Sequence, residues 1–430
     1  MVVALLSLSG RTAYAQLDML GSPRCARGSL LRWSWARVGP QWRMNQGAIS
    51  HPETGEHLSD DPKKANAGRR RVVLAGTTLS VLSVSNFGSQ VRQAQGQQPS
   101  PTPSAPPAAR NIVMVAPTDT IAAIQTKLNS VPAGGSLVLA AGTYPGLIGR
   151  SNVTVWAAGP VTVNGNFDFT GQSNWAIRGA DQNNRITFNG GLVAASLSNH
   201  AAIGWCVFNN QPSNGDNGSA IDFSGASFLM IVNNDFNNVL GNCLAQYNVD
   251  NLTIGGNRFV GCYGPVSINQ DSNATMGRNV RFISNLVTGY TRTGIEVTGS
   301  DPSPPNGVFT NFLVDGNWFV DVATPGPVPY GTGPVSMVAR LQSGTVISNN
   351  FFRPGPNAAP NFGPAIEFDS QATAADIFGN LYESLGAYTF YDLGGNSHGN
   401  KFWNSTGNAP NDSVLTSKPA DPPRPARISW

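Results

Sequence analysis

Apolar and polar residues alternate in short runs along most of the chain, and one recurring run ends in an asparagine followed two residues later by an apolar side chain. The asparagines of these copies are Asn234, Asn257, Asn285, Asn317, Asn350, Asn380 and Asn400, with Cys206 in the equivalent position of an earlier copy. Neighbouring asparagines are between 20 residues (Asn380 to Asn400) and 33 residues (Asn317 to Asn350) apart. Such a period is typical of one coil of a solenoid, in which equivalent residues of stacked coils form columns. We expect the asparagines to be structural and to bond to one another along the stack.

A second strand-like segment lies between the copies, with apolar residues on either side of one polar position. It occurs at 220–223, 265–268, 294–297, 334–337 and 365–368. This period of two is that of a half-buried strand, whose intervening side chains point outward. The outward column is predicted to contain, in coil order, Asp222, Ser267, Glu296, Ser336 and Glu367. Together the two patterns predict an all-β solenoid of about ten coils over residues 111–403.

The segment before the first copies has helical spacing instead. Its apolar residues at that spacing are Ile121, Ile124 and Leu128. Thr118 or Asp119 is placed to cap the N-terminus of this helix, residues 131–135 end it, 137–139 form a strand and 141–144 (Ala-Gly-Thr-Tyr) form a turn. This order resembles the N-terminal cap of the pectin-lyase-like β-helix superfamily. The resemblance implies a single-stranded right-handed parallel β-helix with an N-terminal capping helix, and polysaccharides as the broad substrate class.

The ends of the chain are predicted to lie outside the solenoid. Three arginines at 69–71 precede an apolar run at 72–84 and then small and polar residues, which is the order of an export signal and loosely resembles a twin-arginine signal. The alternative is that this run is a short buried strand or helix. Translation from Met44 rather than Met1 would bring the signal closer to the N-terminus. We therefore expect a secreted or periplasmic protein with an export signal around 69–96 within a poorly ordered segment 1–96, a Pro-rich linker 97–110 and a Pro-rich tail 404–430.

Composition and charge exclude several classes. Charged residues make up only 12% of the chain, about half of what soluble domains usually contain, while 40% hydrophobic residues disfavour disorder. The net charge of +3 is uneven, since residues 1–110 hold 13 basic and 5 acidic residues (13 − 5 = +8) and the remainder holds 14 and 19 (14 − 19 = −5). A mildly acidic body gives no electrostatic reason for nucleic-acid binding. No apolar run reaches the roughly 20 residues of a membrane span, and we expect a monomer.

The four cysteines are Cys25, Cys206, Cys243 and Cys262, none of them in a CxxC pair. We expect buried free thiols, with a disulfide between Cys243 and Cys262 as the alternative in an oxidising compartment.

Catalytic candidates lie on or beside the outward column. Glu296 and Glu367 are about two coils apart, near 10 Å at the backbone, so their carboxyl groups can reach the roughly 6.5–9.5 Å separation of an inverting glycosidase pair. Glu367 and Asp369 alternate on one strand and form a second candidate pair. Arg340 lies between these coils and is expected to bind a uronate or to hold one acid ionised. The competing interpretation is that all four are solvated outward residues.

Further residues are substrate-binding candidates. They are Asp222 of the outward column, Asp271 and Asp301 near the strand exits, and Arg292. Calcium-dependent pectate lyases use clustered acids beside an arginine base, and Asp271, Asp301, Glu296 and Arg292 approximate that set. Ca²⁺ is therefore the one cofactor that the resemblance suggests.

Two aromatic residues complete the substrate-binding candidates. Trp318 and Phe351 follow their asparagines in successive coils and are placed to form a stacking platform for sugar rings. The alternative is that they pack beneath the long proline-rich loops at 302–305 and 325–334.

No enzyme-specific motif narrows the function. The Asn-Thr-Asp, Gly-His-Gly and Arg-Ile-Lys motifs of polygalacturonases are absent, and the body's lysines, Lys127, Lys401 and Lys418, lie away from the middle coils where an alginate-type lyase would need one. We expect an exported protein that binds and cleaves a polysaccharide as a lyase or glycosidase. The alternative is a non-catalytic glycan-binding or cell-surface structural protein. An oligomeric adhesin or phage-type spike would need a trimerisation segment, which residues 404–430 do not resemble.

Overall fold

The computed structural model describes residues 6–8, 11–13, 35–38, 41–44 and 111–429, the last range with gaps at 212–218, 271–276, 300–307, 323–334, 338–339, 342–343, 356–364, 369–374, 384–389, 392–395 and 405–411. The chain divides into two compact units, Met1–Val81 and Leu82–Trp430. The first contains two antiparallel strand pairs, β1 (Leu6–Leu8) with β2 (Arg11–Ala13) and β3 (Trp35–Val38) with β4 (Gln41–Met44).

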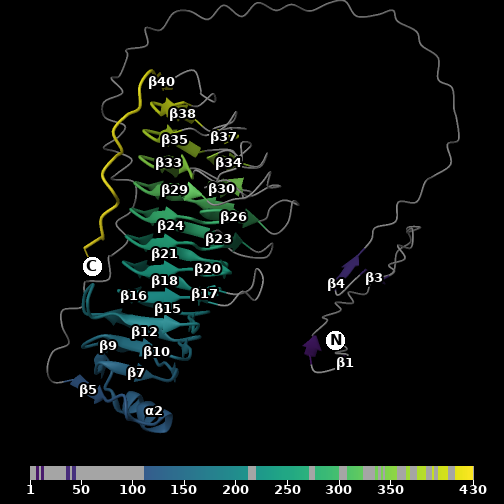
Figure 1. Ribbon diagram of the computed structural model, residues 1–430. Helices are drawn as coiled ribbons and strands as arrows, with labels where there is room; N and C mark the ends of the chain where they lie inside the picture. The colour runs from purple at the N-terminus through teal and green to yellow at the C-terminus, as the bar shows by residue number, and fades with distance from the viewer. Residues whose placement is uncertain are drawn as a thin grey trace, which may run out of the picture. The chain divides into compact units, whose positions relative to one another are not determined.

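The second unit is a stack of coils that form three parallel sheets (Figure 1). The 12-stranded sheet consists of β7 (Gly142–Tyr144), β10 (Val161–Val163), β13 (Ile186–Asn189), β16 (Cys206–Asn209), β19 (Asp235–Asn237), β22 (Arg258–Val260), β25 (Leu286–Thr288), β29 (Trp318–Val322), β33 (Phe351–Pro354), β36 (Leu381–Glu383), β39 (Lys401–Trp403) and β40 (Ser413–Leu415). The 10-stranded sheet consists of β8 (Leu147–Ile148), β11 (Phe167–Asp168), β14 (Val193–Ala194), β17 (Ser219–Asp222), β20 (Asn242–Tyr247), β23 (Gly264–Gln270), β26 (Ile295–Gly299), β30 (Val335–Met337), β34 (Ile366–Phe368) and β37 (Phe390–Tyr391).

The 14-stranded sheet closes the coil. It consists of β5 (Ile112–Val115), β6 (Gly135–Leu139), β9 (Val153–Ala157), β12 (Ser173–Gly179), β15 (Asn199–Gly204), β18 (Ser227–Val232), β21 (Asp250–Gly255), β24 (Gly277–Ile283), β28 (Leu313–Asp315), β32 (Thr345–Ser348), β35 (Ala375–Phe378) and β38 (Asn396–His398), with β27 (Val308–Thr310) and β31 (Arg340–Leu341) beside the main path. Within each sheet the neighbours along that path are parallel copies from successive coils, which confirms the predicted parallel β-helix.

Identical side chains stack inside the coils because the strand register pairs each residue with the equivalent residue of the next coil. Phe208 pairs with Phe236 and Phe236 with Phe259, and the ring centroids are 4.9 and 4.8 Å apart with nearly parallel planes. Stacked aromatic rings and the Ile and Val residues of the three sheets fill one continuous core. The core therefore follows the axis of the solenoid, and function must be sought on its outer faces.

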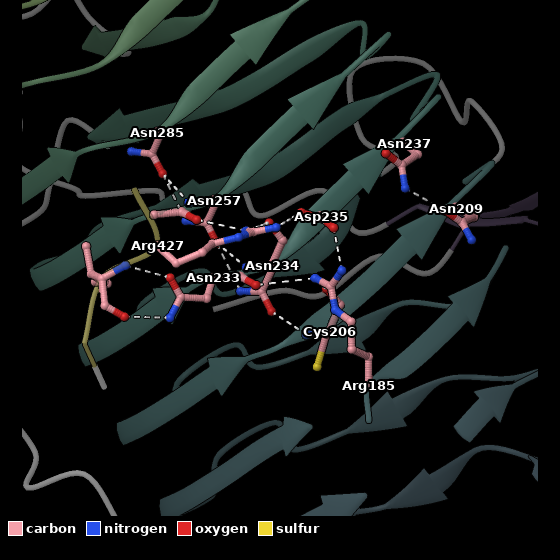
Figure 2. A network of polar contacts seen from close by, with 12 residues as sticks. Arg185, Cys206, Asn209, Asn233, Asn234, Asp235, Asn237, Asn257, Asn285 and Arg427 are labelled. Atoms are coloured by element: carbon pink, nitrogen blue, oxygen red, sulfur yellow. Dashed lines mark hydrogen bonds and ion pairs between the residues drawn. The ribbon is translucent and has the colours of Figure 1, made fainter. Parts of the chain in front are cut away.

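The predicted asparagine ladder is present at the corner before the 12-stranded sheet (Figure 2). The amide group of Asn257 donates to Asn285 Oδ1 (3.1 Å) and to the carbonyl oxygen of Ile231 (2.8 Å), while its backbone N–H donates to the same Asn285 Oδ1 (2.9 Å). The pattern repeats from Asn234 to Asn400 and ends on the carboxylate of Asp412, which occupies the next rung. Each buried amide thus satisfies backbone groups that the turn would otherwise leave unpaired.

The cysteines inside the solenoid are free thiols. Cys206 takes the ladder position of its coil, as predicted, and its backbone N–H donates to Asn234 Oδ1 (2.9 Å). Cys206, Cys243 and Cys262 are buried and unbridged. Burial raises the pKa of the Cys206 thiol to about 12, so this thiol stays protonated and unreactive in the folded protein.

The predicted helix is α2 (Ile121–Ser130), which contacts β5 and β8 at one end of the stack (Figure 1). Its Ile124 and Leu128 join the core, whereas Ile121 is exposed. The predicted cap is wrong by one or two residues, because Thr120 Oγ1 accepts the N–H of Ala123 (3.2 Å). Asp119 instead accepts from Lys127 Nζ and from the N–H of Ala116, and the hydrogen bond from Lys127 is the main reason that its pKa is lowered.

Replacing Thr120 with alanine is expected to lower the stability of the helical end by about 1 kcal/mol, because the N–H of Ala123 loses its acceptor. Urea unfolding followed by circular dichroism measures the loss. Thr126 is the matched control, since its hydroxyl only donates back to the carbonyl oxygen of Ala122 within the helix. A Thr126→Ala variant that loses as much stability as Thr120→Ala would contradict the assignment of the cap.

The described chain continues beyond the predicted end of the body. Strand β40 adds to β39, and the C-terminal segment then runs back along the side of the solenoid, in yellow in Figure 1. We call residues 416–429 the C-terminal strap. Arg427 in this strap bonds to Asp235 on β19, so the strap passes over most of the strands between β39 and β19.

Candidate functional site

The outward column of the 10-stranded sheet has the order that the sequence predicts. It contains one additional residue, Ala245 of β20, between Asp222 and Ser267. Asp222 pairs with Ala245, Ala245 with Ser267, and Ser267 with Glu296. Glu296 then pairs with Ser336, and Ser336 with Glu367. Strand β20, which carries Ala245, was not predicted. Glu296 and Glu367 therefore lie two strand spacings apart on one column, about 10 Å at the backbone.

Glu296 is the centre of a polar cluster on this face. Its neighbours Ile295 and Val297 point into the core, so the alternation of the strand directs Glu296 outward. Arg292 Nη2 donates to Glu296 Oε1 (2.8 Å), and Ser267 Oγ donates to Glu296 Oε2 (3.1 Å). Glu296 is nevertheless only 8% exposed, so its charge is held in a partly desolvated position by these two partners.

Arg292 is the predicted binding residue that the structure brings to Glu296. Its guanidinium also lies 5.7 Å from the centroid of the Tyr263 ring, a cation–π distance. An arginine beside a carboxylate favours the ionised form of that carboxylate. The cluster can therefore present a fixed negative charge and a guanidinium to a ligand that lies along the column. Tyr263 was not predicted, and no local pattern in the sequence distinguishes it.

Asp222 lies apart from this cluster. Strands β17 and β26 are separated by β20 and β23, which places Asp222 about 14 Å from Glu296 along the column. Its carboxylate accepts from Ser196 Oγ (3.1 Å) and Ser224 Oγ (3.1 Å). The structure therefore shows Asp222 bound to one serine of its own coil and one of the preceding coil, and does not join it to Glu296.

Two predicted catalytic residues are described by backbone alone. Glu367 lies in β34 between Ser336 and Tyr391 of the same column. Arg340 lies in β31, whose pairing partner is β27 of the 14-stranded sheet, rather than in the sheet of Glu296. The arginine that the structure places on Glu296 is Arg292. Asp369, Asp271 and Asp301 lie outside the described residues, and their roles stay predictions.

Trp318 and Phe351 do not form an open stacking platform. They are paired in register, but their rings meet edge to face with centroids 5.2 Å apart, and their exposed fractions are 6% and 1%. Arg424 of the C-terminal strap lies over the Trp318 ring at 5.9 Å, and Arg353 lies over the Phe351 ring at 5.3 Å. The loops of the predicted alternative, 302–305 and 325–334, lie outside the described residues, and the segment that reaches Trp318 is the strap.

Within the described ranges, no group of three or more His, Cys, Asp or Glu side chains is arranged to hold a metal ion. Two of the predicted Ca²⁺ ligands, Asp271 and Asp301, lie outside those ranges. In the part of the chain that the structure describes, no helix has the length and apolar character needed to cross a membrane.

Comparison with known proteins finds relatives in structure but none in sequence. No protein-family model matches the chain, and no curated protein matches it. Among solved structures, a mutant tailspike protein of E. coli bacteriophage HK620 superposes with a TM-score of 0.50 at 12% identity, over 76% of this chain and 73% of the tailspike chain.

Two further structures are enzymes by their descriptions. The catalytic unit of a GH87 alpha-1,3-glucanase from Streptomyces thermodiastaticus has a TM-score of 0.43 at 14% identity, over 73% of this chain and 67% of that one. An alginate lyase from a Paenibacillus species has a TM-score of 0.39 at 13% identity, over 71% of this chain and 96% of that one. At such identities the likeness concerns the fold. The fold of this chain is a right-handed parallel β-helix.

Proposed function

We propose that this β-helix protein binds a polysaccharide along the outward column of the 10-stranded sheet and hydrolyses it with Glu296 and Glu367. The observation that carries the proposal is the register of this column, which sets the two glutamates two strands apart with Ser336 between them. That spacing suits an inverting glycosidase, in which a water molecule fits between the sugar and the carboxylate that acts as base. The face can also hydrogen-bond a sugar chain, since Ser267 carries a hydroxyl group and Arg292 a guanidinium group beside Glu296.

The two acids take different roles in this proposal. The ion pair with Arg292 favours an ionised Glu296, which then acts as the general base on water. Glu367 supplies the proton to the leaving oxygen. The proton that Glu296 takes from water and the proton that Glu367 gives to the leaving group balance over one turnover. We also retain export as part of the proposal, because a polysaccharide substrate lies outside the cell.

A second candidate is a non-catalytic glycan-binding protein. It is favoured by the burial of Glu296, both of whose oxygens already have partners in Arg292 and Ser267. A carboxylate held in this way can serve the structure of the face rather than a reaction. In that case sugars would bind along the column and remain intact.

Incubation with a panel of neutral and acidic polysaccharides separates these candidates. The hydrolase predicts new reducing ends without absorbance at the wavelength of unsaturated uronates, and inverted anomeric configuration of the first product by NMR. Unsaturated products would contradict hydrolysis and show a lyase instead. A polysaccharide that stays intact but slows the migration of the protein in affinity electrophoresis would support the binding protein. A panel that yields neither products nor binding would overturn the proposal of a glycan ligand.

A further inference from the structure

The C-terminal strap has a period of three along its sequence. Its partly buried positions include Pro419, Pro422, Pro425 and Ile428, and the residues between them are exposed except for Arg427. The strap's charged side chains precede them by one residue each, at Lys418, Asp421, Arg424 and Arg427. A polyproline-II helix has three residues per turn, so each of these series lies on one side of such a helix. The strap thus has the burial pattern of a polyproline-II segment that lies along a surface.

Each charged residue of the strap meets a partner on the body. Lys418 Nζ lies 3.0 Å from Glu383 Oε1 and over the Trp403 ring at 5.5 Å. Asp421 Oδ2 lies 3.0 Å from Arg353 Nη1, and Arg424 lies over Trp318. The sign of each strap charge is opposite to that of its ionic partner. The contacts therefore follow both the spacing and the charge order of the strap.

The length of the strap matches the spacing of the coils beneath it. From Lys418 to Arg427 the chain advances nine residues, about 28 Å at the roughly 3.1 Å rise of a polyproline-II helix. The body partners at the two ends, Glu383 on β36 and Asp235 on β19, are five strand steps apart, about 24 Å at the spacing of parallel strands. An extended polyproline-II segment therefore keeps pace with the strands that it crosses.

Arg427 is bound by acceptors that belong wholly to the body (Figure 2). Its guanidinium donates to the carbonyl oxygens of Asn234 (3.1 Å) and Gly256 (2.8 Å) and to the carboxylate of Asp235. Asp235 is held from its other side by Arg185, which also donates to the carbonyl oxygen of Cys206 (2.9 Å). These acceptors come from the coil corners, so the backbone fixes the carbonyl groups independently of the strap.

The residue after Arg427 is bound through its backbone. The Ile428 N–H donates to Asn233 Oδ1 (2.9 Å), and Asn233 Nδ2 donates to the Ile428 carbonyl oxygen (2.8 Å). Gly255 and Gly256 lie directly below, where a β-carbon would come within 2.9 Å of the Ile428 side chain and 2.8 Å of its backbone nitrogen. The body thus binds the Ile428 backbone with both polar atoms of the Asn233 amide, and the two glycines leave room for Ile428.

We propose that the outer face of the 12-stranded sheet from β36 to β19 is a binding site for a basic polyproline-II peptide, and that the chain fills it with its own C-terminal strap. In this proposal, the prolines at every third position form the side of the peptide that faces the sheet. The arginine at the C-terminal end of the peptide is recognised by Asp235 and two carbonyl oxygens. Aromatic residues along such a surface are the usual means of binding a preformed polyproline-II helix. The strap is bound as a separable ligand and is not a strand of the fold.

The test uses the full chain with its own strap weakened by Lys418→Ala, Arg424→Ala and Arg427→Ala. A fluorescent peptide of residues 416–430 is added, and its anisotropy is measured. We expect saturable binding to this variant at least 10-fold tighter than to the unaltered chain, whose own strap competes. Binding to the variant should weaken at least 10-fold when Asp235→Asn is added, or when the three prolines 419, 422 and 425 of the peptide are replaced by alanine. Asp376→Asn, on the 14-stranded sheet, is the matched control and should not weaken it.

Three results would overturn the proposal. The first is that the folded variant, checked by circular dichroism, binds no peptide. The second is that it binds a scrambled peptide of the same composition equally well. The third is that Asp235→Asn leaves the affinity unchanged. Should the weakened chain fail to fold, the unaltered chain supplies the test through trypsin cleavage after Arg427, the one basic residue of the strap that is not followed by proline. Excess native peptide should displace the strap and accelerate its cleavage several-fold. Excess peptide with norleucine in place of its basic residues is the control and should not accelerate cleavage. No acceleration by the native peptide would then contradict a separable strap.

Discussion

Replacing Asn317 with alanine is expected to lower the free energy of unfolding by about 3–5 kcal/mol, the largest loss we expect from a single polar side chain of this protein. Asn317 is fully buried, and its amide donates to the carbonyl oxygen of Phe282 (2.9 Å) and to Asn350 Oδ1 (2.9 Å). Its own Oδ1 accepts from the backbone N–H and the amide of Asn285. Alanine would remove the acceptor of the buried Asn285 backbone N–H and the amide donor to the Phe282 carbonyl oxygen, whereas Asn350 Oδ1 would keep the Asn317 N–H and Asn285 Nδ2 would keep the Ile254 carbonyl oxygen. Urea unfolding followed by circular dichroism measures the change.

The control for this prediction is an asparagine on a strand of the 12-stranded sheet that solvent can reach. Asn209 bonds to Asn189 Oδ1 (3.3 Å) and accepts from Asn237 Nδ2 (2.9 Å) in a column on the outside of the coils. Water can replace these bonds, so Asn209→Ala is expected to cost less than about 1 kcal/mol. Equal losses at Asn317 and Asn209 would contradict the view that burial makes the inner ladder essential.

The columns of this fold were predictable because each coil repeats the same physical demand. A buried corner needs an amide that donates and accepts at once, so asparagine recurs there, and its period in the sequence reveals the coil. Strand β20 was missed because its outward residue is Ala245, which pairs with Asp222 and Ser267 but provides no polar residue between apolar neighbours. The pattern used to find the second strand depends on that polar residue.

Other features depended on contacts that no local pattern contains. Thr118, Asp119 and Thr120 are all competent helix caps, and the choice of Thr120 follows from Asp119 being bound to Lys127 and Ala116. The burial of Trp318 involves a strap more than a hundred residues later in the chain, at Arg424. The threefold period of that strap is visible in the sequence, but its meaning requires the surface on which it lies. Likewise the column predicted from the sequence places Ser267 beside Glu296, whereas the ion pair of Glu296 with Arg292 depends on how the chain turns into β26.

Replacing either Glu296 or Glu367 with glutamine is expected to lower kcat for polysaccharide hydrolysis by about 10²–10⁴-fold, since each removes one half of the proposed acid–base pair. Substrate binding should change much less, because glutamine keeps the size and hydrogen-bonding oxygen of the side chain. Reducing-end assays on the substrate found in the panel give kcat and KM. The bell-shaped dependence of kcat/KM on pH should lose its acidic limb in Glu296→Gln and its basic limb in Glu367→Gln. This follows because the base must be ionised and the acid protonated.

The matched control for these glutamates lies on the same column but far from them. Asp168 on β11 is exposed and accepts the N–H of Thr170, and five strand steps separate β11 from β26, about 24 Å. Asp168→Asn should therefore leave kcat and KM within about 2-fold of their original values, well inside the range of a surface substitution. A folded Glu296→Gln variant with undiminished turnover would remove Glu296 from the reaction and leave its ion pair with Arg292 as a structural contact. A polysaccharide that still binds to both glutamine variants but is cut by neither would locate the chemistry at the pair, since the same face would then hold the substrate without its acid or its base.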